Sequence, residues 1–340
     1  MRTECRVPAK LILSGEHAVV FGKPALSLAI NLYGYAQFEF TPANVPQIEL
    51  SLSDFNHHQA WSFQQAWDQA MDIESRYLTY QQAALSIRQV CQSVFDIPLL
   101  VLFHFEQRYG LKSGHWRIGY RSDIWQGRGL GSSAALIVSL LAGLFKLHQI
   151  DDKSALFELS RLIESRQHGQ SSGLDPATLI QGGVIRFQSG QYQSIKTPNH
   201  QAWLIDTGMP ESTTGECVDH VKQHYGSNVA LWQKFGECTD AIHQAWCAAD
   251  TSGLTTAIRQ NQNLLTQIQV VPPGVQAFIQ QLESETQGAA KLCGAGSLVG
   301  DAGGVLMLVS QSSPQSLCKR YGFPFQAIQT DPQGVQCEVA

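Results

Sequence analysis

The residues best suited to do chemistry lie in the stretch GRGLGSSAA at 127–135, where three glycines occur within five residues. Glycine loses the most backbone entropy on ordering, so this stretch predicts a loop whose backbone comes close to a ligand. Leucines at helical spacing follow in the apolar run 136–145, which predicts a helix that starts at the loop. The free N–H groups and the positive dipole end of such a helix suit a di- or triphosphate.

The order of residues in this loop excludes two common phosphate-binding motifs. No GK[ST] follows the glycines, as a Walker A loop requires, and the GxGxxG order of a dinucleotide-binding fold is missing. The alternating segment 115–124 predicts a strand before the loop, which gives the order strand, loop, helix. A glycine-rich turn that only starts a buried helix is the alternative, and this stretch by itself leaves it open.

Two carboxylates form a second candidate group. Glu164 lies late in the predicted amphipathic helix 153–166, and Asp175 follows after glycines that let the chain fold back. Paired carboxylates beside a phosphate-binding loop suit Mg²⁺ ligation and a base for an attacking hydroxyl. A helix C-terminus followed by a hydrophilic loop explains the same residues, so both interpretations stay open at this point.

A third group, Lys10, Glu16 and His17, interrupts an N-terminal stretch of apolar and small residues. The segments 6–13 and 18–21 alternate loosely on either side, which predicts two short strands around a polar kink. Charged groups that are simply solvated at a turn are the alternative.

Length and composition limit the class of protein. A chain of 340 residues predicts roughly two domains. Its 44% hydrophobic and 15% charged residues are typical of a globular protein. The 23 basic and 28 acidic residues give a net charge of −5, which argues against a nucleic-acid partner. No apolar run reaches the roughly 18 residues of a membrane span, so we expect no membrane association.

The eight cysteines are scattered and form no CxxC pair. This spacing suggests neither a zinc knuckle nor a disulfide framework, so the sequence predicts reduced thiols and a soluble, cytoplasmic protein.

The rest of the chain predicts alternating strands and helices. A linker is expected in the Ser/Gln/Asn-rich segment 188–201, and a glycine-rich turn in KLCGAG at 291–296, which could reach the same pocket from a second domain. The other expected elements are strands at 36–52 (a pair), 184–187, 203–205, 305–309 and 335–339, and helices within 56–95, at 211–285 (two or three) and at 313–321.

Three of these stretches resemble, in order, the signature motifs of the GHMP kinase superfamily: PAKLILSGEHAVVFGKPAL at 8–26, GRGLGSSAA at 127–135 and KLCGAG at 291–296. Within that superfamily, GEHAVV at 15–20 is similar to the mevalonate kinases, as are HGQSSGLD at 168–175 and IDTG at 205–208. The resemblance spans nearly the whole chain.

The resemblance implies a two-domain α+β fold. Its N-terminal domain, expected at 1–190 with the glycine loop, would be like domain 2 of ribosomal protein S5, and its C-terminal domain, at 191–340, would be ferredoxin-like. The active site would lie in the cleft between them. The implied reaction is ATP-dependent phosphorylation of the primary hydroxyl of mevalonate, giving 5-phosphomevalonate and ADP on the route to isoprenoids.

Residue roles follow from the same resemblance. Asp175 matches the catalytic aspartate and Lys10 the lysine beside it, while Ser133 and Glu164 match the ligands of Mg²⁺. The substrate-side positions are Glu16, His17, Gly294 and Ala295. The ATP-binding positions of the glycine loop are Gly127, Gly129, Leu130, Gly131, Ser132, Ser133 and Ala134.

Several positions depart from the family pattern. Trp125 and Ser171 stand where prolines are usual, and Thr214 where a lysine or arginine is common. GAGSLVGDAGG at 294–304 replaces a compact glycine run, and its longer loop, with Asp301, bears on the identity of the substrate or on regulation.

Two alternatives remain. One is a related kinase of the superfamily that acts on phosphomevalonate, galactose or another small alcohol; GEHAVV favours mevalonate, and relatives that are decarboxylases usually lack the Glu-His pair. The other is a non-catalytic ligand sensor on the same fold, which the survival of Lys10, Ser133, Glu164 and Asp175 disfavours. A homodimer is common in the family, but the sequence identifies no interface.

Overall fold

The computed structural model describes residues 2–196 and 200–339. The larger of two sheets in this part of the chain has the strand order β12-β1-β2-β5-β3-β4, with β6 paired to β2 and β7 paired to β6. Neighbouring strands are antiparallel except for the parallel pair β3 and β5. Its strands are β1 (Arg2–Ser14), β2 (Ala25–Pro42), β3 (Gln47–Leu52), β4 (His57–Ser62), β5 (Gly114–Ser122), β6 (Val184–Gln188), β7 (Gln191–Ile195) and β12 (Gln336–Val339).

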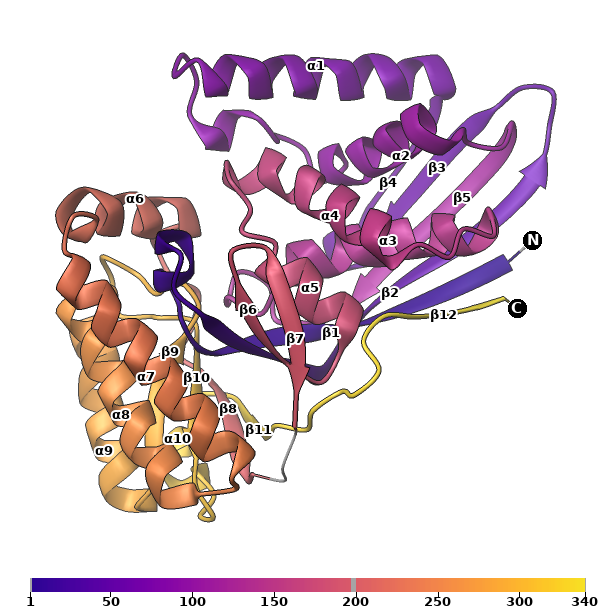
Figure 1. The fold of residues 1–340 in the computed structure, drawn as a ribbon. Coiled ribbons are helices and arrows are strands. Elements are labelled where there is room, and N and C mark those ends of the chain that lie inside the picture. The colour runs from indigo at the N-terminus through magenta and orange to yellow at the C-terminus, as the bar shows by residue number, and fades with distance from the viewer. Residues whose placement is uncertain (1, 197–199, 340) are drawn as a thin grey trace.

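Helices cover this sheet in two layers (Figure 1). The inner helices α3 (Ser132–Leu147) and α5 (Leu174–Gln181) pack directly on β1 and β2. The outer helices α2 (Asp96–Tyr109) and α4 (Lys153–His168) pack on α3, and α1 (Phe63–Gln81) packs on α2. Almost every residue of α3 from Ala134 onward is buried, so the helix that follows the glycine loop is the centre of this half.

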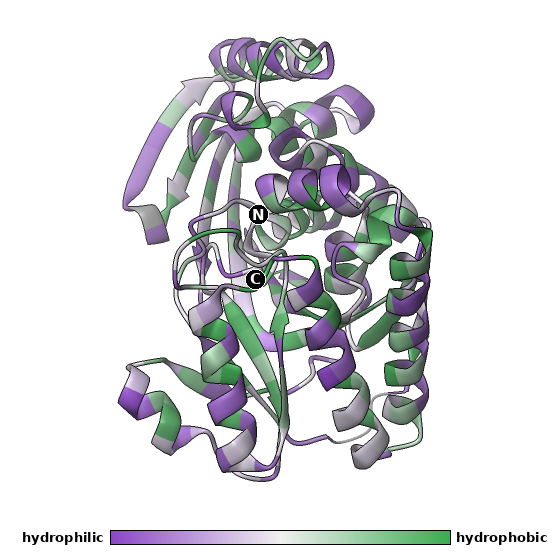
Figure 2. Cartoon of the chain, turned by 90° about the vertical axis from the view of Figure 1, so that its left-hand side faces the viewer, coloured by the Kyte–Doolittle hydropathy of each residue, from purple (hydrophilic) through white to green (hydrophobic). Residues whose placement is uncertain are grey.

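The smaller sheet has the order β11-β8-β10-β9 and is antiparallel throughout. Its strands are β8 (Ala202–Asp206), β9 (Ala289–Cys293), β10 (Val305–Val309) and β11 (Phe325–Ala327). The helices that accompany it are α6 (Thr214–Tyr225), α7 (Val229–Cys247), α8 (Thr251–Gln267), α9 (Pro273–Thr286) and α10 (Gln315–Tyr321). Hydrophilic and hydrophobic residues alternate along these helices (Figure 2), as expected where one helix face packs on a core.

The two halves meet where β1 ends. β1 lies against β9 and α7, and the short 3₁₀ helix η1 (Ala18–Phe21) lies against α7. The Ser14 hydroxyl at the end of β1 is hydrogen-bonded to the Thr239 hydroxyl of α7 at 2.8 Å, and Asn261 of α8 donates to it at 3.2 Å. Strand β1 therefore joins the larger sheet to the helices of the smaller one.

Most of the predicted strands and helices around the motifs are confirmed. The strand before the glycine loop is β5, the helix after it is α3, and the helix expected at 153–166 is α4. The strands expected at 184–187 and 305–309 are β6 and β10.

Other expectations are wrong in their details. Residues 18–21 form the 3₁₀ helix η1 instead of a strand, because His17 and Gly22 have φ angles of 58° and 75° that turn the chain. In the region 56–95, only Phe63–Gln81 forms an α-helix, which is α1. The residues before it, His57–Ser62, form the strand β4. Helices α2 and α5 were not expected, and 211–285 holds four helices where two or three were expected.

The expected linker 188–201 contains a strand, β7, which pairs with β6; its residues 197–199 lie outside the described part of the chain. Both β7 and β12 belong to the larger sheet although they follow residue 190. The division of the chain into domains at 1–190 and 191–340 stays a prediction.

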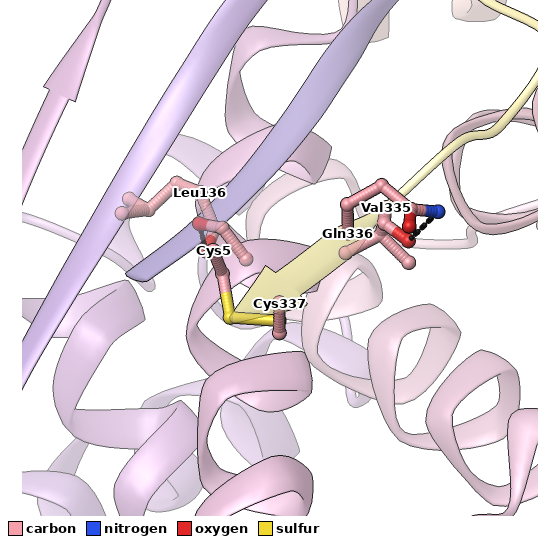
Figure 3. The surroundings of a disulfide bond; sticks show 6 residues. Cys5, Leu136, Val335, Gln336 and Cys337 are labelled. Carbon is pink, nitrogen blue, oxygen red and sulfur yellow. Dashed lines mark hydrogen bonds between the residues drawn. A yellow bond between two sulfur atoms is a disulfide. The ribbon is translucent and has the colours of Figure 1, made fainter. Parts of the chain in front are cut away.

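The prediction that all eight cysteines are reduced is wrong for one pair. Cys5 of β1 and Cys337 of β12 are register partners in adjacent strands, and they form a disulfide (Figure 3). The bond closes a loop over a sequence separation of 332 residues and lies beside Leu136 of α3. It links the two ends of the chain, which lie close together in Figures 1 and 2.

We predict that this disulfide contributes measurably to stability, because a crosslink over a long loop removes entropy from the unfolded chain. Reduction, or the double variant Cys5→Ser/Cys337→Ser, should lower the free energy of unfolding by about 2–5 kcal/mol in urea titrations. The double variant should be insensitive to reductant. Denatured without reductant, the wild type should expose only its six free thiols; eight reactive thiols would contradict the assignment.

Candidate active site

The glycine loop has the geometry that its sequence predicts. Gly127, Gly129 and Gly131 have φ angles of 66°, 81° and 74°, in the region that glycine adopts without strain. Helix α3 begins at Ser132, directly after Gly131, and no side chain caps its first turn. The N–H groups of that turn are therefore not satisfied by a side-chain cap, as a phosphate-binding helix terminus requires.

Lys10 and Asp175, which the sequence places far apart, meet at this helix terminus. The Lys10 Nζ lies 3.1 Å from Asp175 Oδ1, and the backbone N–H of Lys10 donates to the Leu130 carbonyl at 3.0 Å. A Cβ on Gly131 would lie 2.9 Å from Lys10 Cγ and 3.3 Å from Asp175 Oδ2. The Lys10 side chain is buried, whereas that of Asp175 is 24% exposed, so the carboxylate is the member of the pair that a ligand can reach.

Glu164 of α4 lies close behind this pair and is buried. Burial, and then the charge of Asp175, raises the pKa of Glu164 to about 8. The Ser171 hydroxyl donates to Glu164 Oε2, and Ser171 Oγ also accepts the N–H of Gly173 at 3.0 Å. Ser171 therefore uses hydrogen bonds to hold the loop at a position where the family has a rigid proline.

The donor set in this corner fits a divalent cation that is also held by a nucleotide. Among the described residues, no cluster of three or more His, Cys, Asp or Glu side chains could hold a metal ion by itself. The charge of Asp175 nevertheless helps to raise the pKa of the neighbouring Glu164 carboxyl, and a cation with oxygen ligands beside the glycine loop would favour the ionised form of Glu164. The Ser133 hydroxyl is near enough to Gln167 to donate to its side-chain oxygen, so it is not shared with Glu164.

Glu16 faces a partner that the sequence analysis missed. The carboxylate lies in the turn after β1 and forms an ion pair with Lys291 of β9, where both side chains are completely or almost completely buried. Lys291 also donates to the Ile12 carbonyl at 3.3 Å. Burial would lower the pKa of Lys291, but Cys293 and Glu16 beside it raise the pKa above its usual value, so the lysine keeps its charge. Lys291 is the charged residue of the otherwise apolar strand β9, and a lysine in such a strand indicates a buried partner of opposite charge.

His17 is neutral and has one unused nitrogen. Burial lowers its pKa to about 4. Its Nε2 lies 3.0 Å from the Ala295 carbonyl, which can only accept, so Nε2 carries the proton and Nδ1 is an acceptor. The buried Nδ1 has no hydrogen-bond partner within the described structure. His17 Nδ1 is therefore a buried acceptor without a partner among the described residues, and the ring is held against Ala295 of the third glycine motif.

The third glycine motif, KLCGAG at 291–296, contacts the glycine loop at 127–131. Gly294 has a φ of 96°, and a Cβ on it would lie 3.3 Å from the Gly129 Cα. A Cβ on Gly129 would in turn lie 3.2 Å from the Cys293 carbonyl oxygen. The two loops pack backbone to backbone, which brings Gly294 and Ala295 into the same site as the phosphate loop.

The longer loop at 297–304 is tied to the segment before α6. The Ser297 hydroxyl accepts the N–H of Ser212 at 3.2 Å, and the Ser212 hydroxyl accepts the N–H of Leu298 at 3.0 Å. Thr214, noted above for its departure from the family, is the first residue of α6, whose N-cap is Thr213.

A pocket of about 740 Å³ lies between the end of α1 and the end of α4. It is lined by the end of α1 and by the chain around the end of α4, through Tyr77, Tyr80, Gln81, Ala83, Leu85, Ser165, Gly169 and Gln170.

No helix among the described residues is both long and apolar enough to cross a membrane.

Residues 96–183, which contain the phosphate loop, Glu164 and Asp175, match the GHMP kinases N terminal domain. The chain is 30% identical to the mevalonate kinase of Thermococcus sibiricus over 234 residues, which cover 66% of this chain and 63% of that protein. It is 26% identical to the mevalonate kinase of Arabidopsis thaliana over 306 residues, 81% of this chain and 80% of the relative. The crystal structure of the Methanococcus jannaschii mevalonate kinase has the same fold, with a TM-score of 0.79, 19% identity and coverage of 96% and 98%.

Residues 96–183 therefore match a GHMP kinase domain, and the chain as a whole shares the two-sheet α+β fold of a solved mevalonate kinase. The aligned region spans just under two thirds of the length of the Thermococcus relative. The two relatives named here are mevalonate kinases, whereas solved structures that share the fold also include a Lactococcus lactis galactokinase and a Streptococcus pneumoniae phosphomevalonate kinase.

We predict that the variant His17→Asn changes how stability depends on pH. Asn is among the residues found most often at positive φ, which is 58° at this position, and it retains a side-chain N–H donor for the Ala295 carbonyl. The pKa of His17 is about 4 in the folded chain, below its ordinary 6.5, so the unfolded state takes up the proton first as the pH falls. Between pH 6.5 and 5 the wild type should lose on the order of 1 kcal/mol more stability than the variant.

The measurement is urea unfolding at fixed ionic strength across that pH range. The exposed His57→Asn variant is the control and should follow the wild type. Parallel pH profiles for the wild type and His17→Asn would contradict a buried, neutral His17.

Proposed function

We propose that the chain is an ATP-dependent mevalonate kinase, which transfers the γ-phosphoryl group of ATP to the primary hydroxyl of mevalonate and yields 5-phosphomevalonate and ADP for isoprenoid biosynthesis. The observation that carries this proposal is the Lys10–Asp175 pair, 3.1 Å apart, against the glycine at the N-terminus of α3. The similarity to mevalonate kinases supports mevalonate as the acceptor.

In this mechanism the partly exposed Asp175 carboxylate receives or orients the proton of the acceptor hydroxyl. The Lys10 ammonium stabilises the negative charge that develops on the acceptor oxygen. The oxygen attacks the γ-phosphorus while the bond to the β–γ bridging oxygen breaks, and the N–H groups at the start of α3 stabilise the charge on the phosphates.

Mg²⁺, when bound with ATP, neutralises charge on the β- and γ-phosphates. We assign it to Glu164 and the Ser133 hydroxyl, because they flank the phosphate loop and the donor set fits a cation shared with phosphate oxygens. For Ser133 this requires a change of partner from Gln167.

The acceptor is assigned to the side of the cleft that contains His17, Gly294 and Ala295. The unused Nδ1 of His17 can accept a hydrogen bond from an acceptor hydroxyl such as the tertiary hydroxyl of mevalonate. Glu16 is engaged with Lys291, so in this proposal it supports the His17 turn instead of contacting the acceptor.

No observation on the described residues favours a different acceptor. Phosphomevalonate would add a doubly charged phosphate, yet Lys10, Lys291 and Arg128 around the cleft are each paired with a carboxylate. The catalytic pair is intact, which weighs against a sensor. A cytoplasmic location and a homodimer remain predictions. The cytoplasmic location was inferred from eight reduced cysteines, and the Cys5–Cys337 disulfide contradicts that premise.

The proposal is tested by ADP release with Mg·ATP and, in parallel, mevalonate, phosphomevalonate, galactose and homoserine. Turnover on mevalonate alone is the expected result. Turnover on another acceptor would discard mevalonate and keep the phosphoryl-transfer site; ATP binding without turnover on any acceptor would favour the sensor.

The variant Asp175→Asn is the matched test of the mechanism. It keeps the size of the side chain but removes the base, so turnover should fall by about 10²–10⁴-fold. Nucleotide binding, measured by calorimetry without acceptor, should persist. Turnover equal to the wild type would remove Asp175 from the catalytic role.

The variant Glu164→Gln should weaken the use of Mg²⁺, because it replaces a charged ligand with a neutral one. The Mg²⁺ concentration for half-maximal nucleotide binding should rise by about tenfold or more. Glu158→Gln is the control, since Glu158 lies on the exposed side of the same helix and pairs with Arg161. An unchanged Mg²⁺ dependence in Glu164→Gln would contradict its role as a ligand.

A further inference from the structure

Arg128 is the charged residue of the glycine loop, and the mechanism above gives it no role. Its Nε donates to Asp206 Oδ1 at 2.7 Å, and its Nη1 donates to the Gln126 carbonyl at 3.3 Å. The Arg128 and Asp206 side chains are only 20% and 12% exposed. A short, charge-assisted bond with this little water around it holds its geometry far better than a surface ion pair does.

Asp206 is itself fixed at the end of β8. Its Oδ1 also accepts the N–H of Gly208 at 2.8 Å. The neighbouring Thr207 hydroxyl donates to the Gly304 carbonyl at 2.7 Å and accepts the N–H of Gly303 at 3.1 Å. The IDTG motif at 205–208 therefore connects the long loop of the smaller sheet to the carboxylate that binds Arg128.

The backbone of the phosphate loop lies directly on this framework. A Cβ on Gly304 would lie 3.0 Å from the Arg128 carbonyl oxygen, and a Cβ on Gly127 would lie 3.2 Å from the end of the Met209 side chain. Three glycines give the loop little conformational preference of its own. A contact with a rigid neighbour must therefore select the loop conformation that binds phosphate.

We propose that Arg128 is a positioning residue, which holds the glycine loop in its phosphate-binding conformation by bonding to Asp206 across the cleft. The inference rests on the proposed function, because it assigns a role within the same nucleotide site. It explains why the IDTG motif, which contributes no group to the reaction, lies beside the loop. A direct contact between Arg128 and phosphate is the competing role, and the two roles differ in what Asp206 does.

The test compares Mg·ATP affinity, measured by calorimetry without acceptor, in Arg128→Met, Arg128→Lys, Asp206→Asn and the double variant Arg128→Met/Asp206→Asn. Arg128→Met and Asp206→Asn should both weaken binding, Arg128→Met by roughly tenfold or more. The affinity of Arg128→Lys for Mg·ATP should lie between those of the wild type and Arg128→Met, because lysine keeps the charge without the guanidinium geometry. The double variant should bind Mg·ATP with an affinity no lower than that of the single variant with the lower affinity.

Hydrogen exchange of the loop amides in the nucleotide-free protein gives a second readout that does not depend on activity. The amides of 127–131 should exchange faster in Arg128→Met and in Asp206→Asn than in the wild type. The matched control is Arg186→Met: Arg186 of β6 pairs with Asp240 of α7 at 3.0 Å, so it also bridges the two halves but away from the loop. This control should keep both wild-type affinity and wild-type exchange.

Several results would overturn the inference. Wild-type affinity and exchange in Arg128→Met would remove any positioning role, and additive losses in the double variant would mean that the two residues act separately. Tighter or unchanged binding in Asp206→Asn, with a loss in Arg128→Met, would assign Arg128 to the phosphate instead. A wild type that binds no nucleotide would refute the proposed function, whereas the exchange experiment would still report on the bond. If Arg128→Met does not fold, Arg128→Lys and Asp206→Asn decide between the two roles.

Discussion

The site depends on close contacts made at glycines, where a side chain would push the neighbouring groups apart. Gly131 lies against Lys10 and Asp175, and Gly129 lies against Gly294. A methyl group at either position would push these segments apart by several tenths of an ångström, and the φ angles add strain for any other residue. Four parts of the chain that are remote in sequence must therefore be brought to one place with little tolerance in their positions.

The fold positions these segments through packed strands and helices, above all β1. Lys10 lies on β1, which is packed between the other strands and α3, so the lysine cannot move independently of the glycine loop. From the other half, the Lys291–Glu16 pair fixes the end of β1 relative to β9 and the turn that follows it. Two fully buried charges gain little net stability because of their desolvation, but they allow few alternative arrangements of the two halves.

The sequence alone predicted the parts of the site that are local. The glycine loop and the helix behind it follow from residue types within one short stretch, and Glu164 and Asp175 were expected to converge because the glycines between them let the chain fold back. The partners of Glu16 and Arg128 were not predictable in this way, because Lys291 and Asp206 are brought to them by tertiary packing. The disulfide shows the same limit, since Cys5 and Cys337 become neighbours only when β12 returns to the first sheet. The strand expected at 18–21 failed for a local reason: the β-forming residues Val19, Val20 and Phe21 are overruled by left-handed turns on both sides.

The two sides of the proposed site differ in the chemistry they use, and in the proposed function this difference separates the phosphoryl transfer from the choice of acceptor. The phosphate side consists of backbone N–H groups and an ion pair, which recognise charge and not the shape of an alcohol. The other side consists of a neutral His17, a glycine turn and the long loop at 297–304, which is held to the segment before α6 by serine hydrogen bonds. In the proposed function, changes within 297–302 would alter which alcohol fits, whereas Gly303 and Gly304 are bonded to Thr207 and lie against the glycine loop at Arg128. The same fold can serve acceptors of different shape when the acceptor side changes and the glycine loop keeps these contacts.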